Sequence, residues 1–156
     1  MSRRNTPLAV CAVVLALLGP LLPQRGWTQS YPQSVTDLIA KAKAQIRIID
    51  MATFKSALDK GNLGLIIDVR EPGEYADGHV PGAINIPRGL IEFRVWSYVG
   101  FPGRLDMRAK ITLYCRSGGR SALAAKSLQD LKFSNVTAVD MNVEDWIKAG
   151  YPLVRE

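Results

Sequence analysis

Four short stretches of the chain are apolar at nearly every position, as buried strands are. They are LGLIIDV (63–69), AINI (83–86), ITLYC (111–115) and VTAV (136–139). Between and after them, apolar residues recur every three or four positions, which is the spacing of amphipathic helices. Buried strands separated by helices are typical of a parallel sheet that is covered on both faces. The pattern therefore predicts an α/β fold with a central, mostly parallel sheet of about five strands and helices on both faces.

Helices are also expected before the first of these strands. One helix, capped by Ser34 or Thr36, should run to about residue 46. A second should begin at Asp50 and end at Gly61, because glycine adopts the left-handed conformation of a helix end without strain. The remaining helical patterns lie at 121–132 and 143–149.

The first 30 residues have the pattern of an export leader. Arg3 and Arg4 precede an uncharged apolar run at 8–22, which is shorter than the roughly 20 residues of a membrane span. We expect cleavage before Tyr31 and an exported, periplasmic protein, with retention as an N-terminal membrane anchor as the alternative. The predicted organisation is a leader at 1–30, an added helical extension at 31–47 and one domain at 48–156.

Charge and cysteine content narrow the function classes. Loss of residues 1–30 would remove three arginines and no acid, so the net charge would fall from +6 to +3, which is too little for a nucleic-acid-binding surface. It would also remove Cys11 and leave Cys115 as the only thiol. No intramolecular disulfide can then form, so Cys115 is either a buried apolar residue or a reactive group.

The sequence around Cys115 favours a reactive thiol. The cysteine ends a predicted strand, and a glycine-rich turn leads from it into a helix that begins near Ser121. Such a turn directs several backbone N–H groups to one point, where the helix dipole adds positive charge. These groups, with the guanidinium groups of Arg116 and Arg120, favour a thiolate and would also hold an anionic substrate. Ser121 either contributes to the site or is a plain N-cap.

Two motifs, in this order and spacing, resemble the single-domain rhodaneses, or thiosulfate sulfurtransferases, of the exported kind. They are IIDVREPGEYADGHVPGAINIPRG (66–89) and YCRSGGRSALAAKSL (114–128), and a weaker match, WIKAGYP, lies at 146–152. The resemblance covers about residues 48–155. It implies that Cys115 is the catalytic nucleophile, which takes a sulfane sulfur from thiosulfate or a related donor and passes it, as a persulfide, to cyanide or a thiol acceptor.

The resemblance also assigns roles to the residues around the cysteine. The substrate would be held by the backbone N–H groups of the loop and by the two guanidinium groups. The resemblance implies that no metal or organic cofactor is needed. It implies a small anionic sulfur donor and a cyanide or thiol acceptor as substrates, and a protein that carries sulfur or a thiol as a possible further partner. A membrane partner is expected only if the leader is retained. The substrate-binding set is Arg116, Ser117, Gly118, Gly119 and Arg120.

Three residues outside the loop are assigned lesser roles. Asp68 and Arg70 end a strand that the family places beside the loop, and we interpret them as a structural ion pair that supports the site, in preference to direct catalysis. Ser121 is the third supporting residue. His79, the only histidine, lies in a turn rich in Gly and Pro and is expected to fix that turn by a hydrogen bond.

Two other functions stay open. One is a rhodanese-like module that binds a partner without catalysis, although such a module would be free to lose Cys115. The other is a cysteine phosphatase or arsenate reductase. Those enzymes have a similar loop with the spacing Cys-x5-Arg, whereas the loop from Cys115 to Arg120 has the spacing Cys-x4-Arg. The phosphatases also place a histidine where this chain has Tyr114.

Two segments near the site are not fixed by the pattern. Met141 and Asn142 stand where the family usually shows two glycines, so the turn before the last helix must differ or be strained. The stretch 88–104 is irregular, and its aromatic residues either pack in the core or in a flap, or form a surface over the site that selects a protein partner. These aromatic residues are Phe93, Trp96, Tyr98 and Phe101.

Overall fold

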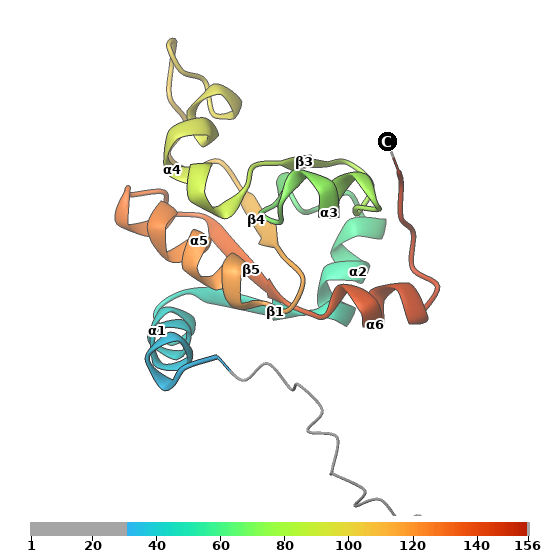
Figure 1. Cartoon of the computed structure of the whole chain (residues 1–156). Coiled ribbons are helices and arrows are strands. Elements are labelled where there is room, and N and C mark those ends of the chain that lie inside the picture. Colours follow the sequence, from blue (N-terminus) through green and yellow to red (C-terminus); the bar gives the residue numbers. More distant parts are fainter. Residues whose placement is uncertain (1–30, 156) are drawn as a thin grey trace, which may run out of the picture. The chain divides into compact units, whose positions relative to one another are not determined.

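A parallel sheet of five strands forms the centre of the computed structural model, which describes residues 31–155 (Figure 1). The strand order is β1-β5-β4-β2-β3, and every neighbouring pair is parallel. The central strand β4 is buried at all four positions. The predicted α/β fold is confirmed. The strands are β1 (Arg47–Asp50), β2 (Leu65–Asp68), β3 (Ala83–Asn85), β4 (Ile111–Tyr114) and β5 (Val136–Asp140).

Each face of the sheet carries its own hydrophobic cluster, because successive side chains of a strand point to opposite faces. Leu113 and Cys115 belong to the cluster beneath α5, whereas Tyr114 belongs to the opposite cluster with Phe54 of α2 and Trp146 of α6. Helices therefore cover both faces, and the cysteine lies on the α5 side. The helices are α1 (Gln33–Lys43), α2 (Met51–Asp59), α3 (Pro72–Ala76), α4 (Ile91–Arg94), α5 (Gly119–Asp130) and α6 (Val143–Lys148).

Strand β1 is an element that the apolar pattern did not identify. It lies at the edge of the sheet, pairs only with β5, and two of its four residues are exposed. An edge strand with polar residues at both ends has no continuous apolar run, so it looks like a connection between two helices. β1 begins at Arg47, which is the last residue of the segment 31–47 that was expected to be a helical extension.

The helix ends agree with the sequence in one case and differ in another. No side chain caps α1, so the expected cap by Ser34 or Thr36 is wrong. α2 begins directly after Asp50, whose carboxylate accepts a hydrogen bond of 2.8 Å from the first turn. Gly61 follows this helix with φ of +62°, as predicted.

The predicted leader, residues 1–30, lies outside the described residues, so the structure does not bear on it. In residues 31–155, no helix has both the length and the hydrophobicity that crossing a bilayer requires.

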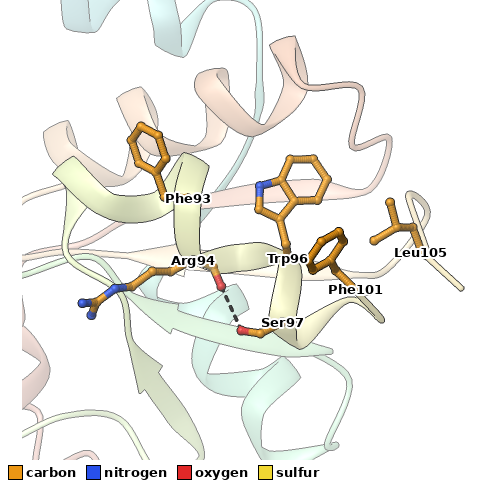
Figure 2. A pocket seen from close by; sticks show the side chains of 6 residues that line it. All are labelled: Phe93, Arg94, Trp96, Ser97, Phe101 and Leu105. Atoms are coloured by element: carbon orange, nitrogen blue, oxygen red, sulfur yellow. Dashed lines mark hydrogen bonds between the residues drawn. The ribbon is translucent and has the colours of Figure 1, made fainter. Parts of the chain in front are cut away.

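The aromatic segment is largely exposed. It consists of two 3-10 turns, Arg88–Leu90 and Val95–Tyr98, on either side of α4, and a loop that follows them. Phe93, Tyr98 and Phe101 are exposed, and only Trp96 packs inward, with its ring 5.4 Å from that of Phe133. Figure 2 shows the open pocket of about 590 Å³ between Phe93 on one side and Trp96, Phe101 and Leu105 on the other. Core packing is therefore wrong for three of the four aromatic residues.

Candidate active site at the end of strand β4

Cys115 follows β4 directly, and its side chain is 1% exposed. Its Sγ accepts a hydrogen bond from the backbone N–H of Ser121, at 3.3 Å, and lies 3.6 Å from the Ser121 Oγ. Both contacts come from the first turn of α5. The thiol therefore faces the N-terminal end of a helix of 12 residues, where the backbone N–H groups and the helix dipole carry partial positive charge.

Ser121 has a more specific position than that of a plain N-cap. The N-cap of α5 is Gly118, so that alternative for Ser121 is wrong. The Ser121 side chain is fully buried, and its hydroxyl lies within hydrogen-bonding distance of two carbonyl oxygens, 3.1 Å from that of Gly118 and 3.3 Å from that of Val139. The same hydroxyl can turn to donate to Sγ when the thiol is ionised. Ser121 is thus placed to respond to the charge of Cys115.

Backbone N–H groups line the loop between Cys115 and Ser121. Within residues 31–155, the N–H groups of residues 116 to 120 donate to no carbonyl or side chain. Gly118 sets this arrangement, because its φ of +81° turns the chain into α5. The φ of Gly118 favours glycine, and a Cβ there would lie 2.3 Å from the Asp140 Oδ1, so the Asp140 side chain would also have to move. The loop thus offers a group of unsatisfied donors beside the thiol.

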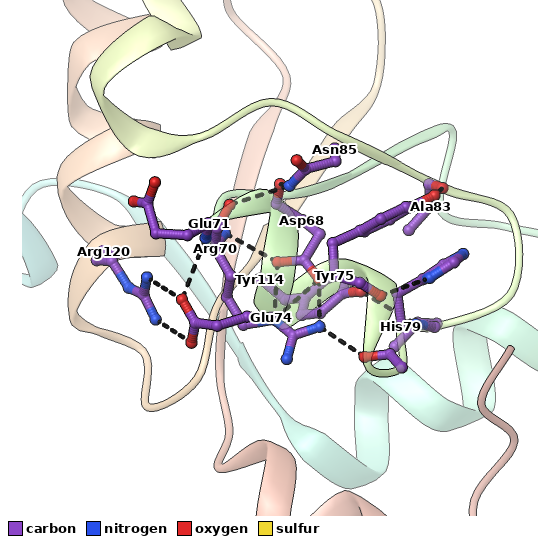
Figure 3. A network of polar contacts seen from close by, with 12 residues as sticks. Asp68, Arg70, Glu71, Glu74, Tyr75, His79, Ala83, Asn85, Tyr114 and Arg120 are labelled. Carbon is purple, nitrogen blue, oxygen red and sulfur yellow. Dashed lines mark hydrogen bonds and ion pairs between the residues drawn. The ribbon is translucent and has the colours of Figure 1, made fainter. Parts of the chain in front are cut away.

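Both loop arginines are paired with carboxylates. Arg116 Nε donates to Glu144 Oε1 at 2.9 Å, and the Arg116 side chain is 61% exposed. The two terminal nitrogens of Arg120 donate to the two carboxylate oxygens of Glu74, at 2.6 and 2.8 Å (Figure 3). The hydrogen bonds from Arg120 lower the pKa of Glu74 from 4.5 to about 2. The guanidinium groups were expected to face a donor, and each already has a partner of opposite charge.

The two carboxylates were not identified from the sequence, although each has a local signal. Glu71 and Glu74 form a capping box at the start of α3, with Pro72 in the first turn. Glu144 lies in the first turn of α6, where acidic residues are favoured. These signals predict helix starts. They do not predict that the helices bring a carboxylate to each loop arginine.

Asp68 and Arg70 form a buried ion pair (Figure 3). Their side chains are 0% and 6% exposed, and Arg70 Nε and Nη2 donate to Asp68 at 2.9 and 2.6 Å. Arg70 Nη2 also donates to the carbonyl of Gly78, at 2.7 Å. Burial lowers the pKa of Arg70, but the hydrogen bonds and charge of Asp68 outweigh it and raise the pKa overall. These bonds tie the end of β2 to the turn after α3, which fits the structural role expected of the pair.

His79 is buried in the turn where it was expected to fix the chain. Its Nδ1 lies 3.0 Å from the carbonyl oxygen of Tyr75, and the two rings stack with centroids 3.6 Å apart. Its backbone forms two hydrogen bonds of 2.9 Å with Val154 near the C-terminus. The geometry therefore agrees with a structural role for His79.

The turn at Met141 and Asn142 contacts the loop without left-handed backbone. Asn142 has φ of −103° and caps α6, because its side chain accepts a hydrogen bond of 2.8 Å from the Glu144 N–H. The next residue, Val143, donates its N–H to the Arg116 carbonyl at 2.9 Å. The turn therefore differs from a double-glycine turn instead of being strained.

A pocket of about 580 Å³ lies against the outer side of the loop. Ser117, Gly119 and Arg120 form part of its wall, and residues of α1 form another part. The structure thus brings four of the predicted loop residues, Arg116, Ser117, Gly119 and Arg120, together at one pocket, whereas Gly118 and the buried Cys115 do not line it. Asp68 and Arg70 do not line this pocket.

Comparisons with known proteins identify the family of this chain. The model of the rhodanese-like domain family matches residues 50–149. A Bacillus subtilis protein, named provisionally as a sulfur carrier protein, is 34% identical over 98 residues, which are 63% of this chain and 49% of that protein. This chain therefore spans about half the length of that relative. A sulfurtransferase of Allochromatium vinosum is 30% identical over 90 residues, or 58% of this chain and 78% of the relative.

Solved structures show the same fold. A protein of unknown function from Rhodopseudomonas palustris, described as a possible tyrosine phosphatase, superimposes with a TM-score of 0.66 and is 28% identical. The match covers 83% of this chain and 100% of that one.

Proposed function

This chain belongs to the rhodanese-like domain family, and we propose that it transfers a sulfane sulfur through a persulfide on Cys115. Relatives in the family are named sulfurtransferases, which supports this reaction class. The observation that carries the proposal is the position of the Cys115 Sγ. It lies 3.3 Å from the Ser121 N–H at the start of α5, beside a loop of unsatisfied N–H groups. A thiolate and a persulfide anion are both stabilised there.

The proposed reaction has two steps. In the first, the Cys115 thiolate attacks the outer sulfur of thiosulfate, a new S–S bond forms, and sulfite leaves with the electron pair of the broken bond. In the second, cyanide or a thiolate attacks the outer sulfur of the persulfide and releases the Cys115 thiolate. Loop N–H groups stabilise the negative charge throughout, without reorganisation at the moment of reaction.

The burial of the thiol adds a requirement. At 1% exposure, Cys115 cannot meet a donor in this conformation. We infer that the Cys115 side chain rotates when a donor enters. The loop itself is held in place, because the carbonyls of Arg116 and Gly118 accept hydrogen bonds from the N–H groups of Val143 and Ala122.

The phosphatase alternative is less well supported, although one structural neighbour is described as a possible tyrosine phosphatase. The loop from Cys115 to Arg120 is one residue shorter than Cys-x5-Arg, which leaves a smaller space for a tetrahedral oxyanion. Arg120 also donates both terminal nitrogens to Glu74. Its guanidinium would have to leave that partner to bind a phosphate.

A silent partner-binding module is favoured by a different observation. Three aromatic side chains of this segment are exposed, two of them, Phe93 and Phe101, line a pocket, and such a surface is suited to a partner. We retain this function as the second candidate, because the exposed aromatic surface does not depend on the loop that carries Cys115. The exposed aromatic residues are Phe93, Tyr98 and Phe101.

We also propose that residues 1–30 are an export leader and that the protein acts in the periplasm. The support is the sequence pattern alone. The N-terminal sequence of the protein recovered from a periplasmic fraction tests this, because cleavage before Tyr31 is expected there.

The intact mass of the full chain, before and after incubation with thiosulfate, tests the proposed function. Because the full chain also carries Cys11, the matched variants are Cys115→Ser and Cys11→Ser. We expect wild type and Cys11→Ser to gain one sulfur atom and to lose it on addition of cyanide, and Cys115→Ser to gain none. If Cys115→Ser still forms thiocyanate from thiosulfate and cyanide, the mechanism is wrong. If wild type gains no sulfur, the partner-binding module is favoured.

A further inference from the structure

α1 lies outside the part of the chain that the family model matches, yet it forms part of the pocket beside the catalytic loop. It packs along α5, and a Cβ on Gly119 would lie only 3.1 Å from the Ile39 Cδ1. At its C-terminal end, Lys43 donates to Asp140 at the end of β5, at 2.8 Å. The helix is therefore held against the loop at two points.

The pocket between α1 and the loop has walls of two kinds. One wall is apolar and is formed by Val35 and Ile39 of α1 together with Leu123 of α5. The other is polar and contains the loop residues Arg116, Ser117 and Arg120, together with the charged side chains of Glu74 and, from α1, Lys43. Val35 and Ile39 are half-buried and lie four positions apart on the same face of the helix, whereas Leu38 on another face is 55% exposed.

The pocket is too large for thiosulfate alone. Thiosulfate has about five heavy atoms, which occupy about 150 Å³ if each takes the volume of a water molecule. The pocket measures about 580 Å³, within the range in which proteins bind organic ligands, about 300–1,000 Å³. The pocket therefore has room for more than the anion, and its lining includes the apolar side chains of Val35, Ile39 and Leu123.

We propose that α1 selects an organic sulfane-sulfur donor, in which the anionic sulfur group contacts the loop and an apolar body contacts Val35 and Ile39. The proposal rests on the sulfur transfer proposed above. An organic thiosulfonate has this chemistry. The Cys115 thiolate attacks its outer sulfur, a Cys115 persulfide forms, the S–S bond of the donor breaks, and an organic sulfinate leaves with the electron pair.

Two thiosulfonates of equal charge test the proposal with the full chain. Benzenethiosulfonate has a large apolar body and methanethiosulfonate a small one, and thiocyanate formation with cyanide measures both. The quantity of interest is the ratio of their kcat/KM values, compared between variants. Because the intrinsic reactivities of the two donors are the same for every variant, they cancel in this comparison.

We expect Val35→Ser and Ile39→Ser each to lower the ratio roughly threefold or more, because each removes apolar contact with the ring. Leu38→Ser is the matched control on the same helix and should leave the ratio unchanged. An unchanged ratio in Val35→Ser and Ile39→Ser, with active wild type, would overturn the role of α1. Wild type that turns over neither thiosulfate nor thiosulfonates would instead contradict the proposed sulfur transfer.

A binding measurement further separates a failure of the role of α1 from a failure of the proposed sulfur transfer, because binding needs no turnover. Benzenesulfinate and methanesulfinate, the two leaving groups, can be titrated into the full chain carrying Cys115→Ser and followed by calorimetry. Tighter binding of benzenesulfinate, which Ile39→Ser weakens and Leu38→Ser does not, supports the apolar wall. Equal affinity for the two sulfinates contradicts it. Far-UV circular dichroism of each variant checks that the overall helix content of the chain is retained.

Discussion

Gly118→Ala is expected to damage both the stability and the activity of the protein. Gly118 has φ of +81°, a conformation that costs a residue with a Cβ about 1–2 kcal/mol. The new Cβ would also lie 2.3 Å from the Asp140 Oδ1. Moving the Asp140 side chain off its rotamer costs about 0.5–1.5 kcal/mol, and losing its exposed pair with Lys43 costs at most about 1 kcal/mol. The total loss of unfolding free energy is therefore about 1.5–4.5 kcal/mol.

Urea denaturation measures this loss, and Gly61→Ala is the matched control. Gly61 has a similar φ of +62°, but a Cβ there would meet nothing within 4 Å, so its substitution isolates the cost of the backbone conformation. Asp140→Ala should recover part of the difference when it is combined with Gly118→Ala, since the crowded carboxylate is then absent. Equal losses for Gly118→Ala and Gly61→Ala would refute the reasoning about space.

The effect on activity follows from the same geometry. Gly118 directs the loop N–H groups, and a displaced loop would hold the persulfide anion less well. We expect kcat/KM for thiosulfate to fall about tenfold or more in Gly118→Ala and to stay unchanged in Gly61→Ala. A folded Gly118→Ala variant with normal kinetics would show that the loop N–H groups do not stabilise the sulfur.

Two further predictions concern the ion pairs around the site. Asp68→Asn should lower the unfolding free energy measured in urea by about 3–5 kcal/mol, because it leaves the Arg70 guanidinium buried without its counter-charge. Asp59→Asn, in the exposed pair with Lys55, is the control and should lower it by less than about 1 kcal/mol. Similar losses for the two variants would contradict the structural role of the buried pair. Because Arg120 lowers the pKa of Glu74 from 4.5 to about 2 in the folded protein, the stability that Glu74 adds should be complete above pH 4.5 and lost as the pH falls toward 2. The difference in unfolding free energy between wild type and Glu74→Gln should accordingly shrink between pH 6 and pH 3, and a difference that stays constant would contradict the pairing.

The sheet and the loop could be predicted because their signals are local. Residues 111–115 are apolar at nearly every position, and a buried central strand needs such a run. β1 could not be predicted in this way, since an edge strand with polar residues at both ends has no distinctive periodicity. The exposure of Phe93 and Phe101 could not be predicted either, because an aromatic residue in an irregular segment has the same sequence signal whether it packs inward or faces solvent.

The surroundings of the loop depend on contacts between distant segments, which local patterns do not report. Arg120 and Glu74 are 46 residues apart, and Arg116 and Glu144 are 28 apart. Their pairing requires α3 and α6 to lie on either side of the loop, which only the packed sheet determines. The involvement of α1 in the pocket is of the same kind, since nothing in its own sequence refers to the cysteine.

These pairs change which groups are expected to hold an anionic donor. A donor that binds Arg116 or Arg120 must compete with a carboxylate already within hydrogen-bonding distance. The N–H groups of residues 116 to 120 have no such competitor among the described residues, and their direction is fixed by the backbone. The arginines then contribute mainly by holding α3 and α6 against the loop. On this argument the backbone is the principal anion-binding group of the site, and the glycine at position 118 is harder to replace than either arginine.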